Sequence, residues 1–151
     1  MSRPKKILAV ASSGGHWLQL LRLRPAFEGH RVVFATTQAD SRLELADEIV
    51  RALPDANRNS KLRLAWLMLC CATLVLWERP DVIISTGAAP GYFVIRLGRL
   101  LGVRTLWLES IANAEEYSLS TRLVLPYADL TLTQWPHLAR PEGPHYCGSV
   151  L

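Results

Sequence analysis

The sequence predicts an α/β protein with a Rossmann-like, doubly wound parallel sheet. Three observations favour this fold: short apolar runs typical of buried strands recur along the chain, segments with helical periodicity separate them, and glycine-rich turns follow two of the runs. Strands that alternate with helices form parallel sheets, whose ligand sites lie beyond the carboxyl ends of the strands. With 151 residues, of which 50% are hydrophobic, the chain is long enough to bury one core.

The chain is organised around its first strand–turn–helix unit, Lys6–Leu23. Gly14 and Gly15 have no Cβ atom, so a ligand can approach the turn closely, and free N–H groups at the start of a helix attract anions such as phosphate. One hypothesis is therefore an anion site; the other is that the glycines only form the turn. His16 begins the helix, where its imidazole either serves a bound anion, by a hydrogen bond or a proton transfer, or is an ordinary half-exposed side chain. The turn sequence SSGGH has neither the G-x-G-x-x-G fingerprint of dinucleotide-binding folds nor the G-K-[ST] ending of a P-loop.

The remaining elements alternate between strands and helices. Further strands are predicted at Arg31–Thr37, Glu48–Leu53, Asp81–Ser85, Val103–Glu109 and Leu130–Thr133. Helices are predicted at Ser41–Asp47 with Ser41 as N-cap, at Leu62–Trp77, from the Gly87–Gly91 turn through Leu101, and at Ser118–Leu125. Because parallel strands end at one edge of the sheet, we expect Gly14–His16, Gly87–Gly91 and Glu109–Asn113 to lie together there.

The predicted helix Leu62–Trp77 is apolar on every side. Its uncharged part, Leu64–Trp77, is shorter than the roughly 20 residues that a membrane-spanning helix needs. A basic stretch precedes it, and Trp66 and Trp77 lie towards its ends, a pattern typical of a helix on a membrane surface. A helix buried beneath a parallel sheet is equally apolar, so both interpretations stay open.

The overall composition narrows the function classes. The net charge is +4, but the chain has no dense run of Lys and Arg with interleaved aromatic residues, which argues against nucleic acid and suits an anionic ligand or membrane surface. Three cysteines, two of them adjacent (Cys70 and Cys71), argue against a disulfide framework and for a reducing compartment. The N-terminus has no apolar stretch long enough for a signal peptide, so a cytoplasmic location is expected. The four histidines are scattered, and neither a metal site nor a cofactor is predicted.

The C-terminal segment 141–151 is rich in turn residues, namely Pro141, Gly143, Pro144 and Gly148. We interpret it as a linker that leads into a second domain, which leaves residues 1–140 as the ligand-binding domain.

Four motifs follow one another along the chain: Ser13–His16; Arg79–Ile84 with the Gly87–Gly91 turn; Leu108–Ile111 with Ser118–Ser120; and Gln134–Pro136. In this order they resemble the acceptor-binding N-terminal half of GT-B glycosyltransferases, especially the kind divided between two subunits. Similar proteins are the membrane-docking subunit of the eukaryotic enzyme that adds the second N-acetylglucosamine to the dolichol-linked oligosaccharide, and small bacterial exopolysaccharide and capsule proteins that work with a separate catalytic subunit.

The resemblance implies an acceptor diphosphate site. In the related single-chain transferase that makes the lipid-linked peptidoglycan precursor, a glycine-rich loop ending in Gly-Gly-His faces the diphosphate of the lipid acceptor. By resemblance, the residues that bind the diphosphate here are Ser12, Ser13, Gly14, Gly15 and Gly87.

The resemblance also implies catalytic and peripheral residues. His16 is the first candidate for the catalytic residue that polarises or deprotonates the acceptor. Glu109 is the next candidate, for the base or an orienting group, unless it is a strand-end carboxylate paired with an arginine. Candidates for contacts with the acceptor sugar are Ser110, Asn113 and Glu115. Candidates for the membrane-docking face are Trp66, Leu67, Leu74 and Trp77.

A partner and a reaction follow from the same resemblance. A nucleotide-sugar-binding transferase subunit would contact segment 141–151 and complete the active site. The pair would move a sugar from a UDP-sugar to a polyprenyl-diphosphate-linked saccharide, for exopolysaccharide, capsule or lipid-linked oligosaccharide synthesis. The chain would be inactive alone and would lie on the inner face of the cytoplasmic membrane. The alternatives are a non-catalytic membrane adaptor that activates the partner, and a free-standing nucleotide-binding domain.

Overall fold

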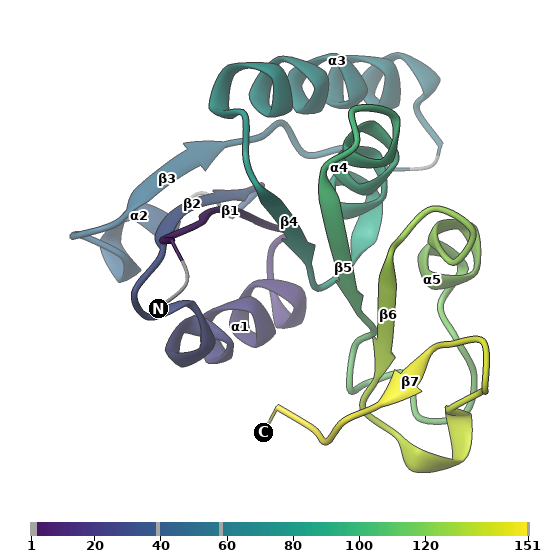
Figure 1. The fold of residues 1–151 in the computed structure, drawn as a ribbon. Coiled ribbons are helices and arrows are strands. Elements are labelled where there is room, and N and C mark those ends of the chain that lie inside the picture. The colour runs from purple at the N-terminus through teal and green to yellow at the C-terminus, as the bar shows by residue number, and fades with distance from the viewer. Residues whose placement is uncertain (1–2, 39, 58, 151) are drawn as a thin grey trace.

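The computed structural model describes residues 3–38, 40–57 and 59–150. Over this part of the chain, seven parallel strands form one sheet in the order β3-β2-β1-β4-β5-β6-β7 (Figure 1). The strands are β1 Lys6–Ala11, β2 Arg31–Thr36, β3 Ile49–Ala52, β4 Val82–Ser85, β5 Arg104–Leu108, β6 Leu130–Thr133 and β7 His145–Tyr146. The direction of winding reverses between β1 and β4, which confirms the doubly wound fold predicted from the sequence.

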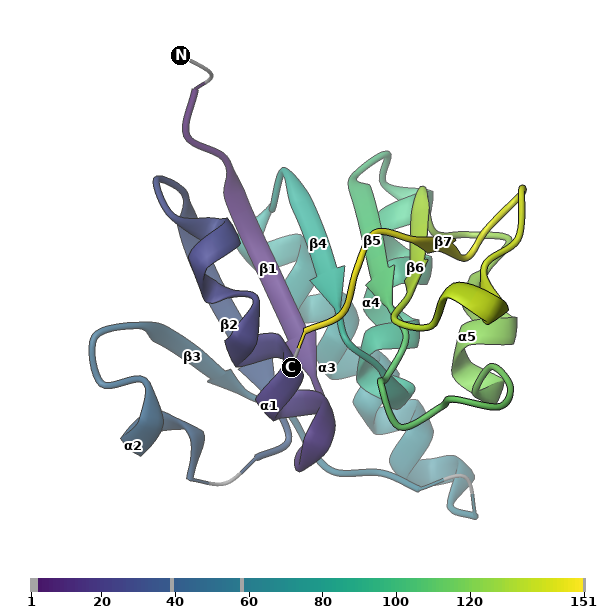
Figure 2. The same ribbon diagram turned by 90° about the horizontal axis from the view of Figure 1, so that it is seen from below.

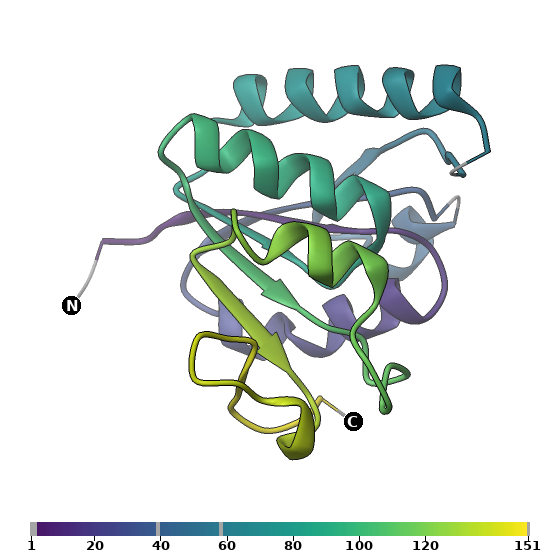
Figure 3. The same cartoon turned by 90° about the vertical axis from the view of Figure 1, so that its right-hand side faces the viewer.

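Helices cover both faces of the sheet. α3, α4 and α5 lie on one face, whereas α1 and the 3-10 turn η1 lie on the other (Figures 1 and 3). Asp40, not Ser41, is the N-cap residue of α2, so the predicted cap is wrong by one position. The helical elements are α1 Gly15–Arg22, η1 Arg24–Phe27, α2 Ser41–Glu44, α3 Lys61–Glu78, α4 Ala88–Leu100, α5 Leu119–Val124 and η2 Pro136–Leu138.

Two apolar clusters fill the space between these layers. Between the sheet and α3, α4 and α5, the core contains Leu8 and Val10 of β1 together with Trp107 of β5. Between the sheet and α1, Trp17 packs edge-on against Phe34. Because successive residues of a strand point to opposite faces, β1 contributes to both clusters, which explains why its sequence is apolar without alternation.

α3 combines the two interpretations that its sequence left open. One side of the helix is buried against α4 and the sheet, and it consists of Leu67, Cys71, Leu74 and Val75. The other side leaves large apolar side chains exposed, namely Leu62, Trp66, Met68, Leu69, Leu76 and Trp77. Figure 3 shows this helix as the outermost layer, above α4. We call the six exposed side chains the outer face of α3.

The C-terminal end of α3 is fixed by a buried carboxylate. Glu78, only 5% exposed, forms ion pairs with Lys6 Nζ and Arg51 Nε, both at 2.9 Å, and so joins α3 to β1 and β3. Burial raises the pKa of Glu78, but the hydrogen bonds and charges of Lys6 and Arg51 outweigh this effect and hold the pKa below its usual value. A lowered pKa means that folding stabilises the ionised carboxylate of Glu78, compared with the same group in the unfolded chain.

We therefore expect Glu78→Gln to lower the free energy of unfolding at pH 7 by about 1 to 2 kcal/mol, because it removes the charge from two hydrogen bonds. The stabilising contribution of the carboxylate is complete above the pKa of the unfolded chain and disappears as the pH falls through the pKa of the folded protein. Urea unfolding of both proteins between pH 7 and pH 3 measures this loss. Glu28→Gln, at an exposed position without an ion pair among the described residues, is the control. A difference that stays constant down to pH 3 would contradict the assignment.

The C-terminal segment lies on the sheet. His145 and Tyr146 pair with Leu132 and Thr133 as the edge strand β7, so these two residues of the predicted linker 141–151 are part of the sheet, and contact of the segment with a partner subunit stays a prediction. From β7 the chain passes across the face that also carries α1 (Figure 2). There the residues Cys147–Val150 cover an apolar cavity of about 290 Å³.

Candidate functional site

Four segments meet at the carboxyl edge of the sheet, and the sequence predicted that three of them, those after β1, β4 and β5, lie together there. Ser12–His16 follow β1, Thr86 and Gly87 follow β4, Glu109–Ser118 follow β5, and Gln134 begins the segment after β6. In Figure 2 these segments lie at the end of the sheet to which the arrowheads point. Since β1 and β4 flank the reversal of strand order, the first two segments lie at the position where doubly wound sheets bind their ligands.

His16 and Thr86 form two hydrogen bonds that join the turn after β1 to the turn after β4. His16 Nδ1 lies 2.9 Å from the carbonyl oxygen of Thr86, and the Thr86 hydroxyl donates to the carbonyl oxygen of His16 at 2.6 Å. A carbonyl oxygen only accepts, so Nδ1 carries the proton. In the neutral imidazole the lone pair is therefore on Nε2, which has no hydrogen-bond partner within residues 3–38, 40–57 and 59–150. The half-buried ring is thus fixed in the tautomer in which Nε2 can accept a proton.

Gly87 makes this arrangement possible. A Cβ atom at this position would lie 2.5 Å from His16 Nδ1 and 2.6 Å from its Cε1 atom, closer than any real side-chain contact. The backbone at Gly87 also has φ 141°, in a region that side chains rarely adopt. Glycine is therefore required both by the backbone conformation and by the imidazole that packs on it.

The backbone N–H groups at the turn after β1 divide into two sets. Those of Ser13 and Gly14 donate to the side chains of Thr37 and Gln38, at 3.0 and 3.3 Å. The N–H groups of Gly15, His16 and Trp17 have no partner among the described residues, because they precede the first hydrogen bond of α1, from Leu18 N to Gly14 O.

The predicted diphosphate-binding set therefore needs a correction. The amides of Ser13 and Gly14 are occupied, and the amide of Gly87 donates to the Ser85 hydroxyl at 3.2 Å. The available donors are the first-turn amides of α1 and the hydroxyls of the half-exposed Ser12 and the exposed Ser13. The first turn of α1 contains no carboxylate side chain, so its partial positive charge is not neutralised locally.

Glu109 is predicted as a base or an orienting group, and its geometry favours the orienting role. Its side chain is 1% exposed. The carboxylate accepts hydrogen bonds from the N–H groups of Ser110 (2.9 Å) and Ser118 (2.8 Å), from Asn113 Nδ2 (2.8 Å) and from the Ser118 hydroxyl (3.1 Å). Three of these donors reach Oε1 and one, the Ser118 N–H, reaches Oε2, and burial of the side chain keeps the carboxylate away from a substrate hydroxyl. No arginine pairs with it among the described residues either, and its role is to hold the loop 110–118 closed on itself.

The three predicted sugar contacts differ in their availability. Asn113 is held by Glu109, and Ser110, which is 6% exposed, bonds through its hydroxyl to Gln19 Nε2 and the Ala112 N–H. Ser110 is thus buried within the protein, whereas the half-buried Asn113 uses only Nδ2 in this bond, and contact of either side chain with sugar stays a prediction. Glu115 is exposed and faces solvent without a partner among the described residues.

Several residues that organise this edge had no predicted role. Buried Gln19 and Gln134 bond to each other, and Gln19 also bonds to Ser110 and Gln134 to the carbonyl oxygen of Glu109. Trp135 Nε1 and His137 Nε2 contact the carbonyl oxygens of Ile111 and Ala114. Glutamine, tryptophan and histidine occur at so many kinds of position that their type alone carried no signal. The motif Gln134–Pro136 contributes to the family resemblance, but the resemblance assigns no role to its residues.

The predicted membrane-docking residues belong to two different faces of α3. Trp66 and Trp77 are 57% and 77% exposed, whereas Leu67 and Leu74 are 1% and 8% exposed and pack into the core. Leu67 and Leu74 are therefore unavailable to a membrane, and that part of the prediction is wrong. Within the described residues, no helix has the length and apolar character required to cross a bilayer.

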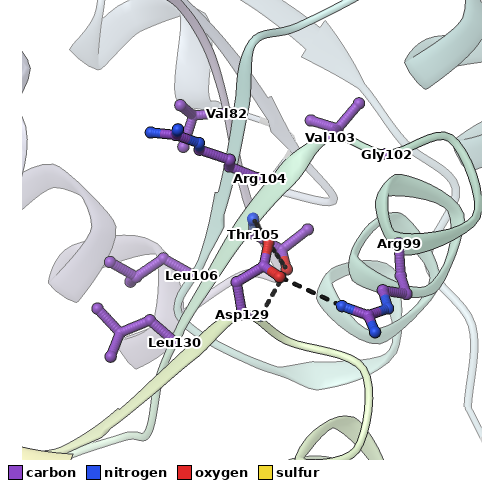
Figure 4. A pocket seen from close by; sticks show the side chains of 9 residues that line it. All are labelled: Val82, Arg99, Gly102, Val103, Arg104, Thr105, Leu106, Asp129 and Leu130. Carbon is purple, nitrogen blue, oxygen red and sulfur yellow. Dashed lines mark hydrogen bonds and ion pairs between the residues drawn. The ribbon is translucent and has the colours of Figure 1, made fainter.

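A second concavity lies at the opposite edge of the sheet. This groove of about 610 Å³ is lined by Val82, Leu106 and Leu130 (Figure 4). An ion pair between Arg99 and Asp129 (3.4 Å) borders it, and Asp129 also accepts a hydrogen bond from the Thr105 N–H. Because the groove is at the amino ends of β4, β5 and β6, we place the candidate site at His16 and not here. The described residues contain no cluster of side chains arranged to hold a metal ion.

Solved structures with the same fold are glycosyltransferases and related UDP-sugar enzymes. MurG from Acinetobacter baumannii superimposes with a TM-score of 0.76 at 14% identity, over 97% of this chain and 46% of that protein. UDP-N-acetylglucosamine 2-epimerase from Rickettsia bellii superimposes with a TM-score of 0.69 at 11% identity, over 89% of this chain and 40% of that protein. The fold is the Rossmann-like N-terminal half of a GT-B glycosyltransferase, and the chain spans less than half of either structure.

Sequence relatives identify the family. The protein family described as "Oligosaccharide biosynthesis protein Alg14 like" matches residues 48–150, and the chain belongs to this family. Two relatives named UDP-N-acetylglucosamine transferase subunit ALG14 are from Yarrowia lipolytica, with 27% identity over 91% of this chain and 78% of the relative, and from Rattus norvegicus, with 28% identity over 87% and 76%. These findings confirm the resemblance stated from the four motifs.

Proposed function

We propose that this chain is the acceptor-binding subunit of a two-component glycosyltransferase. It binds a polyprenyl-diphosphate-linked saccharide and acts with a nucleotide-sugar-binding partner subunit. The names of the relatives support a transferase subunit and suggest UDP-N-acetylglucosamine as the donor. The observation that carries the proposal is the combination, at the reversal of strand order, of unpaired first-turn amides of α1 with an imidazole whose Nε2 is free among the described residues.

Each group has one task in this reaction. The amides of Gly15, His16 and Trp17 hold the acceptor diphosphate, aided by the positive end of α1. His16 Nε2 accepts the proton of the acceptor hydroxyl while its oxygen forms a bond to C1 of the donor sugar. The bond from C1 to the nucleoside diphosphate breaks in the same reaction, and the diphosphate leaves with the electron pair. The turns at 12–16 and 86–91 contain no Lys or Arg, so the partner subunit supplies the charge that stabilises this leaving group.

Reconstitution tests the proposal directly. The chain is purified alone and together with a candidate nucleotide-sugar-binding subunit, and each sample is given radiolabelled UDP-N-acetylglucosamine and a polyprenyl-diphospho-sugar. We expect labelled lipid product from the pair and none from either subunit alone. Transfer by this chain alone would overturn the proposal. A pair that transfers sugar equally well to a free sugar without the lipid diphosphate would overturn the acceptor-binding role.

We further propose that the outer face of α3 docks on the membrane that carries the acceptor. The face exposes two tryptophans and four aliphatic or thioether side chains, far more than an exposed helix surface normally presents. Lys61 and Arg63, both exposed, lie in the first turn of α3 and suit an anionic lipid surface. We propose peripheral binding of this face, and, from the family resemblance, on the cytoplasmic side of the membrane.

We expect the double variant Trp66→Ser, Trp77→Ser to bind anionic phospholipid vesicles about 10²-fold more weakly, because each indole contributes one to two kcal/mol of apolar burial. Vesicle sedimentation measures this partition. The matched control is Leu119→Ser, Leu123→Ser, which removes two exposed leucines from α5 instead. Equal losses in the two double variants would show that docking is not confined to α3, and undiminished binding of the tryptophan variant would contradict the proposal.

A further inference from the structure

Two buried amide side chains connect α1, the loop 110–118 and the C-terminal segment. Gln19 and Gln134 are 4% and 2% exposed. A buried amide is costly unless its hydrogen bonds are made, so such a pair persists only in an arrangement that satisfies it. Gln134 Nε2 donates to Gln19 Oε1 at 2.5 Å and to the carbonyl oxygen of Glu109 at 3.0 Å.

Gln19 joins the pair to the candidate site. It lies in α1 one turn after His16, and its Nε2 donates to the Ser110 hydroxyl at 3.1 Å. Its Oε1 also accepts a hydrogen bond from the Ile111 N–H at 3.2 Å. The helix that carries His16 and the loop that Glu109 organises are therefore fixed relative to each other through one side chain.

Gln134 joins the pair to the C-terminal segment. Its Oε1 accepts a hydrogen bond from the Val150 N–H at 2.7 Å. The carbonyl oxygen of Val150 in turn accepts from Arg22, the last residue of α1, at 3.3 Å. Beyond β7, these are the polar contacts of the segment with the rest of the described chain, and otherwise it covers the apolar cavity lined by Leu106 and Leu132.

The orientation of both amides is determined by their neighbours. Gln134 presents its oxygen to the Val150 donor and its nitrogen to two acceptors, and Gln19 presents its oxygen to two donors. Turning either amide by 180° would face donors with donors and acceptors with acceptors. Only this arrangement satisfies all of these groups. Loss of the Val150 N–H therefore leaves Gln134 Oε1 without a partner, next to the hydrogen bonds that Gln134 makes to Gln19 and Glu109.

We propose that Gln19 and Gln134 are positioning residues that couple the seating of segment 147–150 to the geometry of the loop 110–118 beside His16. A partner subunit that covers the segment holds the loop in the position seen in the structure, and one that displaces the segment loosens it. This inference rests on the proposed function only for its consequence in catalysis. The coupling itself is a property of the isolated chain.

The first test removes one N–H group from the exposed segment. Val150→Pro deletes the donor to Gln134, and Val150→Ala keeps it while removing most of the side chain, so the pair separates the hydrogen bond from packing. Amide hydrogen exchange, followed by mass spectrometry of the isolated chain, reports on peptides that contain residues 110–118. We expect exchange there to be about tenfold faster in Val150→Pro and unchanged in Val150→Ala. Unchanged exchange of the loop in Val150→Pro would overturn the coupling.

The second test asks whether the coupling reaches the acceptor. In the reconstituted pair, Val150→Pro should raise the KM for the polyprenyl-diphospho-sugar about tenfold and leave the KM for the UDP-sugar unchanged. Val150→Ala should change neither constant. Faster exchange of the loop without a change in acceptor KM would restrict the proposal to loop dynamics and overturn its catalytic part. Absence of transfer in every pair would overturn the proposed function, while the exchange experiment would still decide on the coupling.

Discussion

Replacing His16 by alanine is expected to lower kcat of the reconstituted transferase about 10²- to 10⁴-fold, with a smaller change in the KM for the acceptor. Alanine removes the base that accepts the proton of the acceptor hydroxyl, and it also removes the Nδ1 hydrogen bond to the Thr86 carbonyl oxygen. The first-turn amides that hold the diphosphate remain in place, because they belong to the backbone of α1. Steady-state kinetics with both substrates varied separates the two constants.

Two further variants assign this loss to the base. His16→Asn retains an amide that can donate to Thr86 but has no lone pair of comparable basicity, so we expect it to be as inactive as His16→Ala. His30→Ala removes a histidine that accepts a hydrogen bond from the Lys5 N–H, at the amino edge of the sheet, and should leave transfer unchanged. If His16→Asn retained wild-type kcat, the imidazole would be a structural clasp between two turns, and the chain would be an adaptor whose partner performs the chemistry.

The fold followed from the sequence because its signals are local. The apolar run of β1, the turn at Gly14 and Gly15, and the position of Pro90 early in α4 each depend on neighbouring residues only. Parallel pairing then follows from the alternation of strands and helices, and with it the edge at which His16, Gly87 and Glu109 come together.

The roles of individual side chains did not follow, because they depend on partners far away in the chain. Glu109 at the end of a strand suggested a reactive carboxylate, and only the fold of the next nine residues shows four donors around it. Gln134 forms a hydrogen bond to Gln19, which lies 115 residues earlier in the sequence, and no local sequence pattern predicts this contact.

The buried and exposed sides of α3 could not be told apart from the sequence, for a different reason. The helix is apolar all round, so its hydrophobicity does not indicate which side is buried, and Leu67 was assigned to the same face as Trp66. Glu78 was the signal that could have separated them. It shares the inner side with Leu67, Cys71, Leu74 and Val75 at helical spacing, and a charged residue there needs the cations that Lys6 and Arg51 supply.

Gly87→Ala is expected to be nearly as damaging to transfer as loss of His16 itself. The new Cβ atom would lie 2.5 Å from His16 Nδ1, so the imidazole must move away from the Thr86 carbonyl oxygen that orients it. A displacement of about 1 Å of a catalytic group typically costs about 10²-fold in rate, and we expect a loss of this size in kcat. Because alanine is strained at φ 141°, the substitution also lowers the free energy of unfolding by about 1 to 3 kcal/mol.

A matched glycine separates the two effects. Gly102 has φ 72°, but a Cβ atom there would meet nothing within 4 Å. Gly102→Ala should therefore lower the free energy of unfolding by about 1 kcal/mol and leave transfer unchanged, since it is far from the site. Both variants are assayed at a temperature where circular dichroism shows each to be folded, so that the remaining difference in kcat reports on the imidazole. Should folded Gly87→Ala transfer sugar at the wild-type rate, the contact between Gly87 and His16 would not position the base, and His16 would lose the geometric argument for its role.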